Sequence, residues 1–134
     1  DPIYSNLDTS AKTGLMLSIS SSNLPTLQIG DGSSISNFST PTAILADTWY
    51  MIAAVKDDIG NALTLYAFHP NGLEITPVLW HGYASSGKPR CIGQDNSVSP
   101  AQNAIGYIEM FGVIAVALTQ AQLQNLYNVG INGG

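Results

Sequence analysis

The chain has 134 residues, of which 45% are hydrophobic and only 10% are charged, and its formal net charge at pH 7 is −5. This length is enough for one domain with a proper hydrophobic core, and residues 1–134 are taken as that single domain. Four basic residues against nine acidic ones leave no basic cluster, which argues against nucleic acid and anionic membranes as partners.

Two-residue alternation of side chains, interrupted by Gly, Pro, Asn and Ser, recurs along nearly the whole chain. With its enrichment in β-branched and aromatic residues, the pattern predicts an all-β domain whose turns have the spacing of a sandwich. Asp31-Gly32 and Asn71-Gly72 predict two tight hairpin turns. The predicted strands are Leu15–Ser20, Thr26–Ile29, Ile35–Phe38, Trp49–Lys56, Leu63–Phe68, Leu73–Trp80, Arg90–Gly93 and Ile105–Val116.

Two of these strands are apolar on both alternating faces: the first over Trp49 to Val55, and Ile105–Val116 in a similar way. Such a strand is typical of one covered on both sides. We therefore expect both at the core of the sandwich, with Trp49 and Tyr50 as part of the framework and not of a ligand site. The longest apolar run is too short to span a bilayer and contains Glu109, so no membrane insertion is expected.

One amphipathic helix is predicted from about Gln120 to Asn128. Thr119 is placed to cap its first turn and Gln122 to complete a capping box, while Leu118 can pack back onto that turn. The apolar face consists of Leu123, Leu126 and Tyr127, and Gly130 is placed to end the helix. The helix is expected to cover an edge or end of the sheets.

A series of short motifs follows in order along the last two thirds of the chain. They are Trp49-Tyr50, Lys56-Asp57-Asp58, Leu65-Tyr66, Asn71-Gly72, Gly106 to Glu109, and Leu118 to Tyr127. Their order resembles that of the concanavalin A-like lectin and glucanase superfamily, in its laminin-G-like form, over roughly residues 45–130. The resemblance implies a jelly-roll sandwich of two antiparallel sheets with one short C-terminal helix.

The start of the chain departs from that family. Its members carry further strands before the one that matches Leu15–Ser20, whereas Asp1–Lys12 is short and polar and has no Trp. We expect either a reduced domain or opening strands that come from a longer protein or from a neighbouring subunit, since an open sheet edge invites such pairing. The lack of an initial Met and of a leader predicts a processed protein or an excised domain.

Residue patterns for catalysis are missing, so the chain is not expected to be an enzyme. Glycosidases of this fold place carboxylates in a Glu-x-Asp-x-x-Glu pattern, but Glu74 and Glu109 are the only Glu residues and neither lies in one. His69 and His81 lack the spacing of a zinc site and are interpreted as strand-end or loop residues. Cys91 is the only cysteine, so an intrachain disulfide is excluded and a buried apolar role is expected.

Aromatic and polar residues predict a sugar-binding site near the end of one strand. Trp80, His81 and Tyr83 surround a glycine there, and Asp95 and Asn96 could supply hydrogen bonds from another loop. Pyranose rings stack on aromatic faces while their hydroxyls pair with such polar groups. The alternative is that these rings pack in the core or in an oligomer contact.

A calcium ion is a further candidate ligand, because laminin-G relatives often bind Ca²⁺ at the rim. Asp57, Asp58 and Asn61 would supply oxygen ligands from one loop. The alternative is that these residues simply form a hairpin loop, for which Asp and Asn are well suited.

These patterns favour a non-catalytic carbohydrate-binding or adhesion module of a secreted or virion surface protein. The alternative is a structural assembly or decoration domain without ligand, which forms a homo-oligomer or contacts neighbouring structural subunits. That alternative draws on the low charge and the polar, uncharged surface. A glycoside hydrolase comes third, because the carboxylate pattern is missing. An extracellular or virion-surface location is expected in each case.

Overall fold

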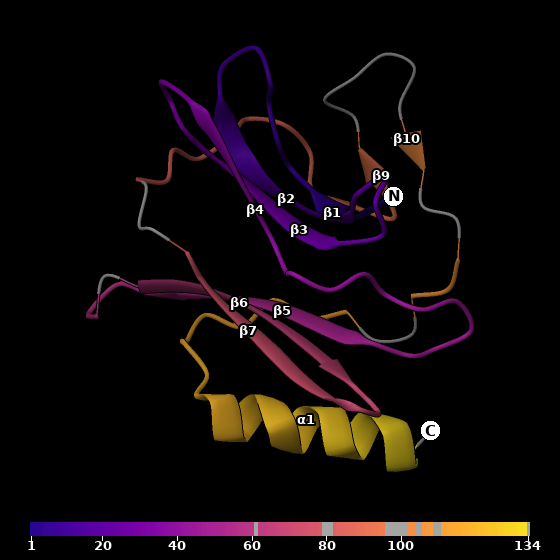
Figure 1. Ribbon diagram of the computed structural model, residues 1–134. Coiled ribbons are helices and arrows are strands. Elements are labelled where there is room, and N and C mark those ends of the chain that lie inside the picture. The colour runs from indigo at the N-terminus through magenta and orange to yellow at the C-terminus, as the bar shows by residue number, and fades with distance from the viewer. Residues whose placement is uncertain (61, 79–81, 96–101, 104–105, 109–110, 134) are drawn as a thin grey trace.

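The computed structural model describes residues 1–60, 62–78, 82–95, 102–103, 106–108 and 111–133, and it is mostly β with one helix near the C-terminal end (Figure 1). The elements are β1 (Pro2–Ser5), β2 (Thr13–Ile19), β3 (Pro25–Asp31), β4 (Ile35–Ser39), β5 (Met51–Asp57), β6 (Ala62–His69), β7 (Gly72–Val78), β8 (Cys91–Ile92), β9 (Gln94–Asp95), β10 (Gln102–Asn103) and α1 (Gln120–Gly133).

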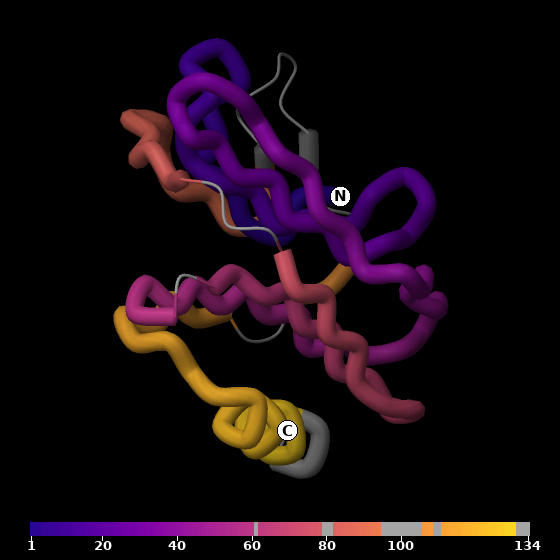
Figure 2. The backbone as a smooth tube through the Cα atoms, turned by 60° about the vertical axis from the view of Figure 1, so that its left-hand side comes forward, coloured from indigo at the N-terminus to yellow at the C-terminus, as the bar shows by residue number. Residues whose placement is uncertain are grey.

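The strands form two main antiparallel sheets. One has the order β4-β3-β2-β1-β8 and the other the order β5-β6-β7, while β9 and β10 form a separate pair. The two main sheets are stacked, and α1 lies along the outer side of the three-stranded sheet (Figures 1 and 2). The predicted antiparallel β-sandwich with one C-terminal helix is confirmed at this level.

The core between the sheets consists of side chains that alternate along β3 and β6. Leu27 and Ile29 of β3 pack against Leu63 and Leu65 of β6, and Leu27 and Leu65 are 1% and 0% exposed. Each fully buried leucine contributes about 1.5–3 kcal/mol relative to an exposed one. Burial of this face fixes the register, because a shift by one residue would turn the leucines outward.

A second apolar layer lies between the three-stranded sheet and α1. Phe68 of β6 packs there with Leu123 and Tyr127 of the helix. The predicted capping box is present: the Thr119 N–H donates to Gln122 Oε1 at 2.9 Å, and the Gln122 N–H donates to Thr119 Oγ1 at 3.3 Å. These bonds satisfy backbone groups that a helix leaves unpaired at its start.

The end of the helix differs from the prediction. The helix continues through Gly130 to Gly133, and Leu126 is 41% exposed although it was predicted on the apolar face. A glycine inside a helix costs only about 1 kcal/mol relative to alanine, which need not end it. The three-stranded sheet packs on Leu123 and Tyr127 through Phe68 and leaves Leu126 exposed.

The position of β5 corrects the prediction of a central strand. Ile52 faces the core between the sheets and Met51, Ala53 and Val55 face the helix layer, so both faces are covered. In the described sheet, however, β5 is an outer strand and β6 is the central one. Trp49 precedes β5 and is 53% exposed, so it is not part of the framework as predicted. An apolar pattern reports which faces are covered, but not which neighbours lie beside the strand.

The second predicted core strand, Ile105–Val116, is wrong in the part that the structure describes. Residues 106–108 and 111–116 are in no strand, and their exposed side chains include Tyr107 (90%), Val113 (70%) and Val116 (70%). The alternation predicts a strand only if an edge is available to pair with it.

The polar start of the chain forms a strand that was not predicted. Tyr4 and Ser5 of β1 pair with Leu17 and Met16 of β2 on one side, and β8 lies on the other. One strand therefore does precede β2.

Cys91 in β8 is half-buried instead of buried. Among the helices described, none is long and apolar enough to cross a membrane.

Candidate functional site

A cavity of about 170 Å³ lies at one end of the sandwich, where the chain passes from one sheet to the other. Its apolar wall includes Pro25 at the start of β3, Ile44 in the connection to β5, and Ala67 in β6. Its polar wall consists of Tyr50, His69, Asn71 and Glu74. We take this cavity as the candidate site and call it the rim pocket.

The alternation of β6 brings the polar residues to the rim pocket. Leu63, Leu65 and Ala67 face the core between the sheets, and His69 is the next residue on that face. Glu74 of β7 is the register partner of Ala67, so it shares the same face. The hairpin turn between them carries Asn71. The sheet therefore continues its core face into a polar end.

Tyr50 joins the same face from the start of β5. Met51 pairs with Phe68, so Tyr50 is one residue before the strand and is level with His69. The two rings lie with centroids 5.4 Å apart at an interplanar angle of 31°. This separation is within the range of favourable aromatic contacts. The pair gives the rim pocket an aromatic wall.

Residues 40–48 connect β4 to β5 and cover the rim pocket, and we call them the covering segment. Backbone hydrogen bonds attach this segment to the five-stranded sheet. The N–H of Thr40, which is 1% exposed, donates to the Pro25 carbonyl at 3.0 Å. The Ile44 N–H donates to the Asn23 carbonyl at 2.8 Å. These bonds hold the covering segment in place and leave the side chains of the three-stranded sheet free to line the cavity.

Two longer bonds cross from the covering segment to the polar wall. The Leu45 N–H donates to the Tyr50 hydroxyl oxygen at 3.2 Å, and the Thr42 N–H donates to Glu74 Oε2 at 3.4 Å. The second is beyond the usual range for an N–H···O bond and is therefore weak. The half-buried Glu74 carboxylate thus keeps most of its acceptor capacity.

Of the residues predicted to bind a sugar, some lie outside the described residues: these are Trp80, His81 and Asn96. Tyr83 is 38% exposed, and Lys56 Nζ lies 6.0 Å from its ring centroid, at the limit of a cation–π contact. Asp95 is in β9, where its backbone pairs with β10. The predicted sugar site therefore stays a prediction.

Tyr83 and the rim pocket lie at opposite ends of β3. The Ala84 N–H, next to Tyr83, donates to the Gly30 carbonyl at 3.0 Å, near the end of β3. Pro25, the first residue of the same strand, lines the rim pocket. One sugar ring cannot contact both places.

The residues predicted to bind calcium make contacts of a hairpin loop. Asp57 Oδ1 accepts the N–H groups of Ile59 at 3.0 Å and Gly60 at 3.1 Å, and Asp58 forms an ion pair with Lys56 at 2.7 Å. Asn61 lies outside the described residues. Within the part of the chain that is described, no three His, Cys, Asp or Glu residues are grouped to hold a metal ion. These contacts support the hairpin alternative.

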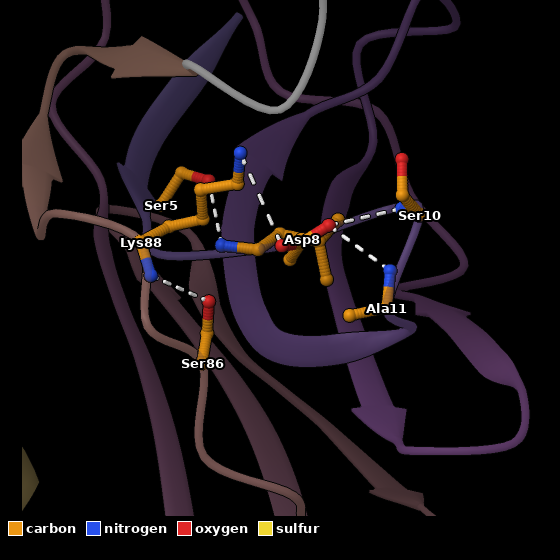
Figure 3. A network of polar contacts seen from close by, with 7 residues as sticks. Ser5, Asp8, Ser10, Ala11, Ser86 and Lys88 are labelled. Atoms are coloured by element: carbon orange, nitrogen blue, oxygen red, sulfur yellow. Dashed lines mark hydrogen bonds and ion pairs between the residues drawn. The ribbon is translucent and has the colours of Figure 1, made fainter.

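Another polar network connects the segment after Tyr83 to the turn before β2 (Figure 3). Asp8 accepts the N–H groups of Ser10 and Ala11 at 3.0 Å each, and Lys88 Nζ lies 3.9 Å from Asp8 Oδ2. The Lys88 N–H donates to Ser86 Oγ at 2.9 Å. The backbone bond from Ala11, together with the charge of Lys88, lowers the pKa of Asp8. Its groups are occupied with each other, so the network is structural.

The sequence alone does not predict a site at the rim pocket. It predicts Tyr50 in the framework and His69 at a strand end or in a loop. The alternation from Leu63 onward, together with the turn at Asn71, does place His69 and Glu74 on the core face. The covering segment had no such signal, because residues 40–48 show no periodic pattern.

Comparisons of the chain with protein-family models, with curated proteins and with solved structures give no match.

Proposed function

We propose that this domain is a non-catalytic carbohydrate-binding module and that the rim pocket holds one sugar ring. The observation that carries the proposal is the aromatic pair of Tyr50 and His69 beside the polar groups of Asn71 and Glu74 in one cavity. Sugars need both kinds of surface, because their C–H faces pack on rings while their hydroxyls form hydrogen bonds.

The size of the cavity sets the size of the ligand. Drug-sized molecules occupy pockets of about 300–1,000 Å³. A cavity of about 170 Å³ is well below that range and suits a single ring, such as the terminal residue of a glycan. The rest of the glycan would extend into solvent.

The single carboxylate among the described lining residues supports binding without cleavage. Glycoside hydrolysis uses two carboxyl groups about 5–9.5 Å apart, on either side of the scissile bond. Glu74 is the only carboxylate among the described residues that line the rim pocket. A bound sugar would therefore lack the second group that hydrolysis requires.

We further propose that the sandwich is a concanavalin A-like jelly roll of the laminin-G-like form and that it belongs to a secreted or virion surface protein. The order of motifs from Trp49 onward supports the family, and the two stacked antiparallel sheets are consistent with it. The low share of charged residues supports the location.

A glycan array followed by ligand-observed NMR tests the binding proposal. The purified domain is expected to bind a small set of related glycans saturably, and His69→Ala is expected to weaken that binding by about tenfold or more. Because His69 is only half-buried, the thermal midpoint of the His69→Ala variant should lie no more than a few degrees below that of the wild type.

Tyr83→Ala is the matched control, because it removes a partly exposed ring at the other end of β3. Binding that survives this change but not His69→Ala supports the rim pocket. The reverse result would move the site to the residues predicted from the sequence. Repeating the array with a chelator tests the predicted role of calcium. If no glycan binds under any condition, the result would contradict a carbohydrate-binding function.

A specific observation favours a second candidate function, that of a structural assembly domain. Apolar side chains are exposed within residues 106–108 and 111–117, including Ile114 at 57% and Val116 at 70%. Phe111 stacks on Tyr4 with centroids 5.4 Å apart, and Leu118 packs in the helix layer. A run of this kind on a folded domain often marks a protein contact.

We propose a second copy of this chain as the occupant of that surface. Glu109 is the only charged residue between 106 and 118 in a chain of net charge −5, so two such segments meet with little repulsion. The outer edge of β5 is also unpaired among the described strands, and the same segment passes close to β5 in both views (Figures 1 and 2). Such an edge can pair with its symmetry-related copy.

Sedimentation velocity across a range of concentrations tests the assembly candidate. A defined oligomer is expected, and Val113→Asp combined with Val116→Asp should shift it to monomer with little loss of stability, since both side chains are 70% exposed. Val129→Asp on α1 is the control, because that side chain is 65% exposed on a different surface. A monomer at every concentration would contradict this candidate.

A further inference from the structure

We propose that the rim pocket selects sugars that carry a free amino group over neutral and acidic sugars. This inference rests on the proposed carbohydrate-binding function and names the class of sugar. It follows from the charge of the groups that line the cavity and from the bonds that those groups already make.

Glu74 is the only charged side chain among the described residues that line the rim pocket. The basic residues of the chain are Lys12, Lys56, Lys88 and Arg90, and none of them lines it. The ion pairs found in the described part of the chain involve Asp58 and Asp8, not Glu74. A negative charge in the cavity is therefore left without a cationic partner from the protein.

The Glu74 carboxylate also has spare acceptor capacity. The one hydrogen bond that it accepts within the described part of the chain, from the Thr42 N–H, is long at 3.4 Å. A carboxylate can accept several hydrogen bonds, and those from an ammonium group are roughly twice as strong as neutral ones. A protonated amine on the ligand would satisfy this group better than a hydroxyl.

The aromatic wall favours the same ligand. Tyr50 and His69 line the cavity together with Glu74, and an ammonium group over the face of a tyrosine ring is attracted by it. A carboxylate on the ligand would instead meet the like charge of Glu74 in a half-buried place. The cavity thus attracts an amino sugar and repels a uronic acid.

The test is a set of titrations with four methyl glycosides that differ in one group: glucosamine, N-acetylglucosamine, glucose and glucuronic acid. They are followed by NMR at about pH 7, where an aliphatic amine is largely protonated. The glucosamine glycoside is expected to bind about tenfold more tightly than the glucose glycoside. The glucuronic acid glycoside is expected to bind most weakly. N-acetylation should remove the advantage, because it removes the charge but keeps the nitrogen.

Glu74→Gln assigns the preference to one side chain. The amide has the same shape without the charge, so the glucosamine glycoside should lose its advantage, and the ratio of its affinity to that of the glucose glycoside should fall to about one. Asp47→Asn is the matched control: it removes the same charge from an exposed residue outside the cavity lining and should keep the preference. Asp47 has φ 53°, a conformation that asparagine also adopts readily.

The outcomes separate this inference from the function on which it rests. Equal binding of the charged and neutral sugars, or a preference that survives Glu74→Gln, would overturn the amino-sugar inference and leave the carbohydrate-binding function standing. Binding of none of the sugars, by a chain that remains folded, would overturn both.

Discussion

The two ends of β3 show how similar residues can serve structure at one place and remain available for binding at another. At the far end, which is the end away from the rim pocket, Asp31 Oδ1 accepts the N–H groups of Ser33 and Ser34 at 2.7 Å each. At the near end, which opens into the rim pocket, the carboxylate of Glu74 accepts only the long bond from Thr42 among the described residues. The comparison teaches that a polar cluster becomes a candidate site where its acceptors are not already used by the backbone.

The two ends also differ in how tightly the backbone is packed. Gly14 lies beside the far end of β3, where a Cβ atom would come within 2.3 Å of the Asn6 carbonyl oxygen and 2.8 Å of Ser86 Cβ. The near end keeps a cavity of about 170 Å³, because the connection from β4 to β5 crosses there between the sheets. The far end is therefore a closed contact and the near end is an opening.

The largest effect is expected where the closed end is broken. Gly14→Ala should lower the free energy of unfolding by about 3 kcal/mol or more, because the residue has φ +85° and its Cβ would overlap backbone. Urea unfolding measures the loss. Gly82→Ala is the control at the same end: its nearest contact would be an ordinary 3.8 Å to Asp31 Cβ, and it should cost under about 1 kcal/mol. Equal costs would contradict the closed-end description.

A smaller effect is expected from the covering segment of the open end. Tyr50→Phe removes the hydroxyl that accepts the Leu45 N–H, and should cost about 1 kcal/mol by urea unfolding. Tyr83→Phe is the control at the closed end and should be close to neutral. If Tyr50→Phe is also neutral, the hydroxyl does not hold the covering segment.

The Asp31 turn is expected to show itself at acid pH. Hydrogen bonds, the largest effect coming from Ser34 and the next from Ser33, lower the pKa of Asp31 in the folded protein below its ordinary 3.8. The ionised carboxylate therefore stabilises the fold above that pH, and this stabilisation is lost as the pH falls through the pKa of the folded state. Asp31→Ala should be less stable than the wild type at neutral pH, and the two should converge as the pH falls below about 3.8. Thermal unfolding at a series of pH values measures this, and parallel curves would contradict it.

The smallest effect is expected at Glu74. Glu74→Gln should change the free energy of unfolding by less than about 0.5 kcal/mol, since only one long bond is affected. Circular dichroism on heating is sufficient to measure it. A large loss would mean that the carboxylate supports the fold, as Asp31 does, and the contrast between the two ends would no longer hold.

Much of the fold follows from local patterns. The alternation of Leu63–Phe68 and the Asn71-Gly72 turn predicted the β6–β7 hairpin, and the Thr119 and Gln122 pair predicted the start of α1. Strands with a strong period and helices with a capping box depend on neighbouring residues, so their signals are local. The prediction of a strand over Ile105–Val116 failed for its described residues, 106–108 and 111–116, because strand pairing depends on a distant edge.

The candidate site was less predictable than the fold. The sequence predicts a site at Trp80 and His81, which lie outside the described residues, and it predicts Tyr50 in the framework and His69 at a strand end or in a loop. They meet because the register of β5 and β6 brings residues 50 and 69 level, although they are far apart in the chain. A register involves two strands, and neither strand alone specifies it.

By itself, the sequence determined that this is an antiparallel β-sandwich with one C-terminal helix, because periodicity, turn residues and caps act over a few neighbouring positions. Only the tertiary structure decided which apolar strand lies at the edge, which apolar segment remains exposed and where a cavity opens. The reason is that each depends on contacts between residues far apart in the chain. Tyr50 and Glu74 line one cavity because two turns and a crossing segment bring them together, and no local pattern records that arrangement.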